Sequence, residues 1–278
     1  MPGFPPAPDP LAIPVLDSHC HLDMAVGEGS MDVAQALAAA TAVGVTRIVQ
    51  IGCDLAGAHW AVQVASTTAA IVAGVALHPN EAPRIAADAG RDALVDAWAQ
   101  IDRLAAHPRV RAVGETGLDF FRTSADGHAV QEESFRRHIA MAKEHGKALV
   151  IHDRDAHQDV LRVLEQEGAP DTVVFHCFSG DAAMAEHCVA HGWVLSFAGT
   201  VTFTNAENVR AALRVTPLDQ MLVETDAPFL TPVPYRGRPN ASFLVPYTLR
   251  AMAQVKGVTE DQLCAAIDET GTRVFGVF

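Results

Sequence analysis

Two histidines at the end of a short apolar run are the first residues in the chain whose types and spacing could do chemistry. His19 and His21 stand two positions apart in the run Val15–Leu22. Alternate residues of a β-strand point to the same side of a sheet, so both imidazoles could bind one metal ion. A single pair is a weak signal in a chain with 13 histidines. Its weight depends on how the later apolar runs end.

Later apolar runs also end at, or shortly before, a histidine or a carboxylate. Imidazole and carboxylate ligands together suit Zn²⁺ or Mn²⁺, and a set of this size could hold two divalent cations. The residues concerned are His78, Glu115, His152, His176 and Asp226.

The elements that must position these residues are strands alternating with helices. Helical periodicity predicts helices over Met31–Val43, with Ser30 as N-cap, over Gln131–His145 before Gly146, and over Ala156–Glu167 before Gly168. The predicted strands are Val15–His19, Thr46–Ile51, Ile71–Leu77, Val110–Glu115, Ala148–His152, Thr172–His176, Trp193–Phe197 and Met221–Glu224.

This alternation predicts an α/β fold, a TIM-type (β/α)8 barrel with a metal site at the C-terminal ends of its strands. Strands separated by helices pair in parallel, and eight of them suffice to close a barrel. An open, doubly wound sheet would need a Gly-rich phosphate loop after the first strand. The first strand of this chain runs into His-Cys-His instead.

In such a barrel, the order of the strands decides which side chains are close enough to bind the same ion. Its first and last strands are neighbours, so the two histidines of the first strand should share one ion with Asp226. His152 and His176 follow the fifth and sixth strands and should share the other ion, and Glu115 can give one oxygen to each. Two ions about 3.5–4 Å apart can polarise a phosphoryl group and activate a bridging water.

Each of these residues also has an ordinary structural explanation when taken singly. His152 and His176 could be surface histidines, Glu115 a turn acid, Asp226 a turn cap, and His78 a structural residue. Five strand ends would then have to carry ligand types by accident. A carboxylate that ends an apolar strand is nearly buried and needs a partner. The joint pattern therefore favours a metal site.

Composition limits the other possibilities. A hydrophobic content of 49% indicates a large core, and no apolar stretch is long enough for a membrane span. Five scattered cysteines without a C-x-x-C pair suggest free thiols and a cytoplasmic protein. Residues 1–10 are Pro-rich and predict a flexible leader, followed by a single barrel domain over 11–278. A net charge of −13 argues against tight, extended DNA binding.

At this point the sequence resembles the TatD family of metal-dependent deoxyribonucleases, within the amidohydrolase-like barrels. The motifs stand in the family's order and span nearly the whole chain, from Asp17 to about Phe275. They are the runs Asp17–Asp23, Gly74–Pro79, Gly114–Asp119, Val150–Ala156, Phe175–Gly180, Glu224–Pro228 and Pro234–Asn240.

The resemblance implies the same two-ion ligand assignment and adds a substrate-facing role for His78. It implies hydrolysis of DNA phosphodiester bonds from a 3′ end, with two divalent cations (Zn²⁺, Mn²⁺ or Mg²⁺) and with weakly bound single-stranded DNA as substrate. We expect no stable protein partner and no membrane association. Asp226 could orient the attacking water and take its proton, so it is a candidate catalytic residue together with Glu115 and His78.

Substrate contacts are less well defined by the sequence. Arg236 is the candidate for a fork-like contact to phosphate, and pairing with Glu224 is an equally good interpretation. Arg122 and Arg154 are weaker candidates. Two departures from the family pattern bear on substrate fit more than on chemistry: the pair Phe120–Phe121 replaces a more usual tyrosine-bearing pair, and Thr270–Phe275 lacks an expected asparagine.

Two other functions are compatible with the same barrel. Many relatives of this architecture hydrolyse amides, lactones or small phosphoesters, often with a carbamylated lysine at a strand end. Lys147 precedes the predicted fifth strand rather than ending it, which favours the nuclease. A non-enzymatic protein that acts in quality control through partners is the other alternative, but an inactive scaffold need not retain a full ligand set.

Overall fold

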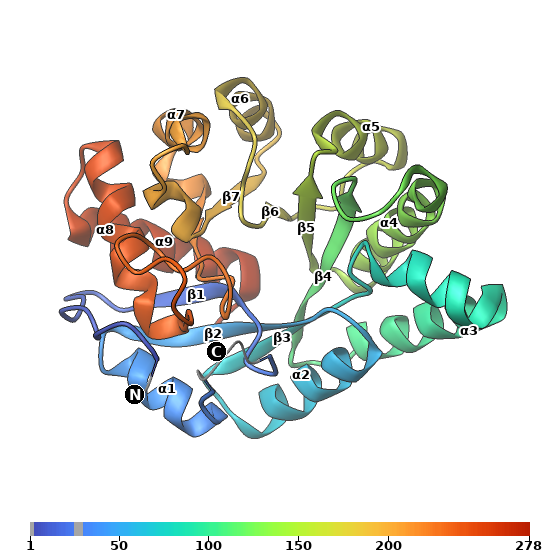
Figure 1. Cartoon of the computed structure of the whole chain (residues 1–278), viewed down its shortest axis with the longest axis horizontal. Coiled ribbons are helices and arrows are strands. Elements are labelled where there is room, and N and C mark those ends of the chain that lie inside the picture. The colour runs from blue at the N-terminus through green and yellow to red at the C-terminus, as the bar shows by residue number, and fades with distance from the viewer. Residues whose placement is uncertain (1–2, 25–29) are drawn as a thin grey trace. The chain divides into compact units, whose positions relative to one another are not determined.

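Parallel β-strands alternate with helices along the whole chain (Figure 1). The structure is a computed structural model that describes residues 3–24 and 30–278. The strands are β1 (Val15–Cys20), β2 (Val45–Gly52), β3 (Ile71–Val75), β4 (Val110–Asp119), β5 (Ala148–Arg154), β6 (Val173–Phe175), β7 (Val194–Phe197) and β8 (Met221–Val223).

The helices follow the strands in turn, with short 3-10 turns near the C-terminal end of the chain. The α-helices are α1 (Val33–Thr41), α2 (Leu55–Thr67), α3 (Glu81–Ala105), α4 (Ala125–His145), α5 (His157–Glu167), α6 (Ala182–Ala190), α7 (Glu207–Val215), α8 (Val245–Lys256) and α9 (Glu260–Phe275). The 3-10 turns are η1 (Gly199–Thr202), η2 (Leu218–Gln220) and η3 (Ser242–Leu244).

The strand order gives the fold class. Within the described part of the chain, eight strands follow one another through a single sheet in the order β1 to β8. Sequential parallel strands, each followed by a helix, are the topology of a TIM-type (β/α)8 barrel. The predicted fold class is therefore confirmed.

The chain divides into two compact units, the first of which comprises residues 1–50 and 176–278. In this unit β1 pairs in parallel with β2, with Asp17 opposite Ile48, and β7 pairs in parallel with β8. A further parallel bridge joins Cys20 to Ala227, just beyond β8. This bridge brings the segment after β8 beside the end of β1.

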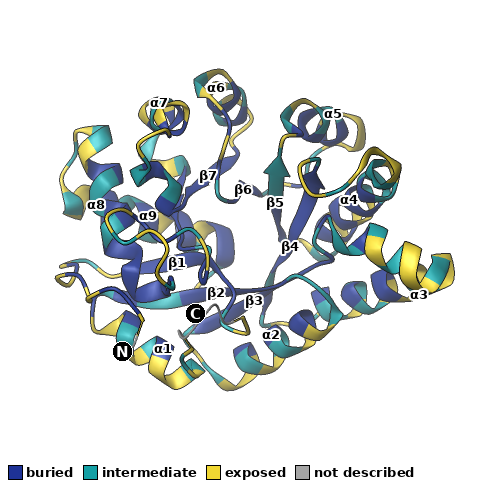
Figure 2. Ribbon diagram, viewed as in Figure 1, coloured by how far each residue is buried: buried dark blue, intermediate teal, exposed yellow. Residues whose placement is uncertain are grey.

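The second unit comprises residues 51–175. Here β3, β4, β5 and β6 pair in parallel in that order. The register of β4 on β5 places Gly117 opposite His152 and Asp119 opposite Arg154. Strand residues in both units are almost entirely buried, whereas one face of most helices is exposed (Figure 2). The amphipathic helix α5, for example, buries Val160, Val163 and Leu164.

Predicted helix ends agree with the structure better than predicted helix starts. Asp32, not Ser30, is the N-cap of α1, because its carboxylate accepts a hydrogen bond from the Gln35 amide while the Gln35 side chain accepts one from Asp32. Helix α4 begins at Ala125, six residues before the predicted start at Gln131. It ends before Gly146 as predicted, with that glycine in the left-handed conformation at φ 60°.

Residues 3–10 form no helix or strand, but they pack against residues near the C-terminal end of the first unit. Phe4 is buried and lies 5.9 Å from Phe243 between ring centroids. Arg238 donates hydrogen bonds to the carbonyl oxygens of Gly3 and Phe4. Residues 1 and 2 of the predicted leader lie outside the described residues, and the boundary between leader and domain stays a prediction.

Two expectations from composition can be compared with the structure. The five cysteines are free thiols. None of the helices in the described ranges is long and apolar enough to cross a membrane.

Candidate metal centre

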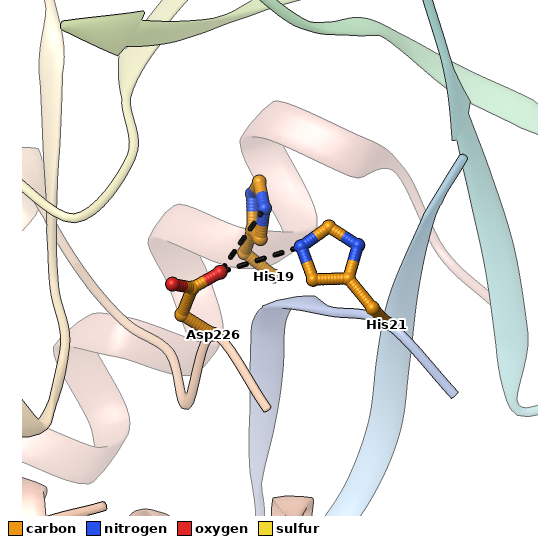
Figure 3. A group of neighbouring side chains, drawn as sticks. All are labelled: His19, His21 and Asp226. Atoms are coloured by element: carbon orange, nitrogen blue, oxygen red, sulfur yellow. Dashed lines mark ion pairs between the residues drawn. The ribbon is translucent and has the colours of Figure 1, made fainter. Parts of the chain in front are cut away.

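Two histidines and an aspartate meet at the ends of β1 and β8 in the first unit (Figure 3). The Nε2 atoms of His19 and His21 lie 3.8 Å and 3.3 Å from Oδ1 of Asp226. Backbone bonds set this arrangement: the amide of Asp226 donates to the His19 carbonyl at 2.9 Å, and the amide of His21 donates to Ala227 at 2.7 Å. The i, i+2 spacing on a strand thus turns both imidazoles toward one carboxylate oxygen.

The surroundings of Asp226 favour its charged form. Burial on its own would raise the pKa of this carboxyl. The hydrogen bond with His21 and the neighbouring imidazoles of His176 and His19 outweigh burial, so the pKa of Asp226 is lowered. The group is therefore a carboxylate at neutral pH, as both a metal ligand and a proton acceptor must be.

A second aspartate supports the segment that carries Asp226. Asp17 is fully buried and accepts hydrogen bonds from the Thr225 amide at 2.9 Å and from the Thr225 hydroxyl at 2.6 Å. Burial raises the pKa of Asp17 to about 6, although the bonds from Thr225 act in the opposite direction. Asp17 thus fixes the strand end that presents Asp226.

His176 lies against the same cluster. Its ring stacks on that of His19, with centroids 3.9 Å apart and an interplanar angle of 12°. Its Nδ1 atom is 3.2 Å from Oε1 of Glu224, a carboxylate with no exposed surface. The same oxygen accepts a hydrogen bond from the Cys177 amide at 2.9 Å. A carboxylate on Nδ1 fixes the ring and leaves Nε2 to act as a ligand.

The second unit forms its own cluster around Glu115, near the ends of β4 and β5 and just after β3. Oε1 of Glu115 lies 2.7 Å from Nδ1 of His152 and 3.2 Å from Nε2 of His78. Glu115 is only 4% exposed, so it is not a solvated turn acid. Burial lowers the pKa of His78 even though the Glu115 carboxylate favours the protonated ring. His78 is therefore close to Glu115 in space, not a remote structural residue.

Asp119 is a further acid of this cluster and was not among the residues predicted from the sequence. Its Oδ2 lies 3.5 Å from Nε2 of His152, and the ligand atoms of His78, Asp119 and His152 all lie within 4.8 Å of one another. Burial would raise the pKa of Asp119, but hydrogen bonds from His152 and from the Arg122 amide lower it well below its usual range. The matching signal was available: Asp119 stands four residues after Glu115, at the end of the same strand.

A polar network holds Asp119 in place. The Asn80 amide donates to Asp119 at 3.3 Å, and the Phe121 and Arg122 amides donate to its other oxygen at 3.1 Å and 2.9 Å. The buried Gln131 side chain accepts from the Asp119 amide at 3.0 Å. A network whose groups all have partners holds its side chains rigidly, so Asp119 keeps its position beside His152.

Gly117 is required where β4 approaches β5. Its φ of 133° is rarely adopted by residues with a side chain, and a Cβ atom at this position would lie 2.1 Å from the His152 carbonyl oxygen. The glycine between Glu115 and Asp119 therefore allows both acids to approach His152.

The donor set fits divalent metal ions. Ligands about 2.1 Å from a tetrahedral ion lie about 3.4 Å apart, which is close to the separations between the Asp226 oxygen and the imidazoles of His19 and His21. These imidazoles are almost fully buried beside the Asp226 carboxylate. Imidazole and carboxylate donors suit Zn²⁺ and Mn²⁺.

The predicted arginine contacts turn out differently. Glu224 contacts His176 and not Arg236, so the interpretation of an Arg236–Glu224 pair is wrong. The Arg236 guanidinium instead lies 4.1 Å from the ring centroid of Phe203. Arg154 lies over the exposed ring of Phe121 at 3.9 Å. Lys147 immediately precedes β5, at the opposite end of that strand from His152.

Comparison with known proteins agrees with this geometry. The family model described as TatD related DNase matches residues 16–276. The metal-dependent hydrolase TatD of Mycobacterium tuberculosis is 45% identical over 268 residues, covering 95% of this chain and 98% of that protein. The metal-dependent hydrolase YabD of Bacillus subtilis is 35% identical, covering 95% and 99%. The crystal structure of YJJV, a TatD homolog from Escherichia coli, has a TM-score of 0.85 at 25% identity and covers 95% of this chain and 98% of its own. This chain belongs to the TatD family of metal-dependent hydrolases.

Proposed function

We propose that this protein is a deoxyribonuclease that removes nucleotides from the 3′ end of single-stranded DNA with two divalent cations. The observation that carries the proposal is the buried set of His19, His21 and Asp226 in a chain of the TatD related DNase family. The free thiols support a cytoplasmic location for this activity, because cytosolic proteins rarely contain disulfides.

We assign one cation to the cluster of the first unit, with His19, His21, Asp226 and one oxygen of Glu115 as ligands. Glu115, His152 and His176 would hold the second cation. This assignment rests on the strand order of the barrel and on the family resemblance. The distances within each unit are compatible with it, since His152 lies 2.7 Å from Glu115 and His176 stacks on His19.

Each side chain of this site would have a separate role in hydrolysis. A bound pair of divalent cations supplies Lewis-acid stabilisation and a water of lowered pKa. Asp226, held ionised by its histidines, accepts the proton of the attacking water at its carboxylate. The imidazole of His78 donates a hydrogen bond to a phosphate oxygen. Glu224 and Asp119 keep His176 and His152 in their ligand orientations.

The decisive experiment removes the metal and restores one metal at a time. Chelated protein is given Mg²⁺, Mn²⁺ or Zn²⁺, and the shortening of 3′-labelled and 5′-labelled oligonucleotides is followed. We expect metal-dependent loss of the 3′ label from single strands and loss of activity in Asp226→Asn. Asp88→Asn, at an exposed acid on α3, is the matched control. Failure of every reconstituted form to cleave DNA would refute the nuclease.

The same preparations decide between the alternative functions. A panel of amides, lactones and small phosphoesters tests the amidohydrolase-like alternative, which would be supported by metal-dependent turnover of one of them without DNA cleavage. Retained affinity for a protein partner without any turnover would support the quality-control alternative.

A further inference from the structure

We infer that a cavity beside His21 in the first unit is a binding subsite for the 3′-terminal nucleobase of the DNA strand. The inference deepens the proposed nuclease function and rests on it. The cavity has a volume of about 630 Å³, within the usual range for sites that bind small molecules or their parts. It is lined by Phe203, by residues 228–231, by residues 236–239, and by Gly3 of the N-terminal segment.

The cavity lies directly next to the proposed metal ligands. Phe229 lines it and also contacts His21, with ring centroids 6.4 Å apart at an angle of 63°. The Phe229 amide donates a hydrogen bond to the Asp226 carbonyl at 2.9 Å. A group held in this cavity would therefore be no more than one side chain away from the site where phosphate is hydrolysed.

The lining suits a flat aromatic ring. Phe229 is 45% exposed, so part of its ring is available to a ligand. The Arg236 guanidinium is stacked on Phe203 at 4.1 Å, and no carboxylate pairs with it in the described ranges of the chain. Aromatic rings and arginine planes are the surfaces on which bases of single-stranded nucleic acids stack.

A phosphate group is a poorer occupant than a base. Most of the lining is apolar, through phenylalanine, leucine and proline side chains. Of its two arginines, Arg238 is already occupied by the carbonyl oxygens of Gly3 and Phe4. Arg236 alone would leave most oxygens of a buried phosphate without donors, which is costly. A base can instead bury its faces and offer one polar edge to Arg236.

The first test measures stacking without catalysis. A short single-stranded oligonucleotide carries 2-aminopurine, whose fluorescence is quenched by stacking, at its 3′ end, and is titrated with metal-free protein. We expect quenching with the unchanged protein and with Phe229→Trp, and about 5-fold to 100-fold weaker binding with Phe229→Ala. The matched control is Val215→Ala, at an exposed apolar residue of α7. Equal quenching by Phe229→Ala, or the same response from a 5′-terminal probe, would overturn the inference.

The second test uses turnover and separates the two proposals. The reconstituted enzyme receives oligonucleotides that end in a normal or an abasic 3′ nucleotide. We expect Phe229→Ala to raise KM for the normal substrate and to leave KM for the abasic one unchanged, with unaltered metal content. Equal effects on both substrates would refute the subsite and leave the nuclease standing. Absence of DNA cleavage by the unchanged protein would refute the nuclease itself.

Discussion

Replacing Glu224 by glutamine tests whether the acid behind His176 tunes a metal ligand. Glu224 is fully buried, and one oxygen contacts both His176 at 3.2 Å and the Cys177 amide at 2.9 Å. Glutamine keeps the shape and can still accept both bonds, but it removes the negative charge that makes the imidazole a better ligand. Loss of such a carboxylate weakens metal affinity by about 10-fold to 100-fold, which corresponds to about 1.4–2.8 kcal/mol. The substitution also places an amide N–H₂ where Oε2 now has no hydrogen-bond partner in the described structure. An unpaired amide donor at this buried position lowers the free energy of unfolding by about 1–3 kcal/mol.

The assay for Glu224→Gln is a competition titration of Zn²⁺ against a chromophoric chelator, combined with urea unfolding of the metal-free protein. Glu165→Gln, at an exposed acid of α5, is the matched control and should change neither quantity. We expect weaker binding of the metal ion proposed for His176 and lower stability in Glu224→Gln. Unchanged zinc affinity together with reduced stability would show that Glu224 only supports the fold, and the reasoning about His176 would be refuted.

Three further substitutions test other parts of the structure. Glu115→Ala should lose bound metal and turnover together, because both ions lose a ligand; two metals by elemental analysis with full activity would end the two-ion assignment. Gly117→Ala should displace His152 and lower metal occupancy at least 10-fold, measured by the same chelator competition. Burial lowers the pKa of His138 from 6.5 to about 4, so the unfolded chain takes up a proton at higher pH than the folded one. Stability should therefore fall by about 2 kcal/mol from pH 7 to pH 5, relative to His138→Gln, in urea titrations. Parallel pH profiles for the two proteins would contradict a neutral, buried His138.

Strands were easier to predict than helix starts, for a physical reason. Each predicted strand overlaps an observed one because β-branched apolar runs in a barrel are buried on both faces and so lack polar interruptions. Helix starts depend on single side-chain hydrogen bonds, and Asp32 outcompetes Ser30 because it also forms a capping box with Gln35. The early start of α4 at Ala125 has a serine, Ser124, as its N-cap residue, but the Ser124 side chain forms no capping hydrogen bond.

The candidate ligands at the strand ends could be predicted, but the side chains that hydrogen-bond to those ligands could not. His19, His21 and Asp226 were grouped from spacing and strand order, and these three lie together in the first unit. Pairing with Glu224 was one of two interpretations of Arg236, whereas the observed partner of Glu224 is the ring of His176. Hydrogen bonds of this kind depend on which face of a short strand end points inward. The backbone geometry at Cys177 and Asp226, both with positive φ, is not visible in residue types.

The net charge of −13 can be reconciled with the proposed DNA substrate by the distribution of the arginine side chains. Several arginines of the second unit are neutralised locally on helix surfaces: Arg84 by Glu81, Arg91 by Glu133, and Arg136 by Glu132 and Glu167. Arg236 has no such partner within the described residues and lines the cavity beside His21. In the proposed nuclease, few phosphates could therefore be neutralised at once, and affinity for DNA would come from bound metal ions and from stacking on Phe229. Binding that depends on these short-range contacts is weak over long duplexes and strongest at a strand end, which is where an exonuclease acts.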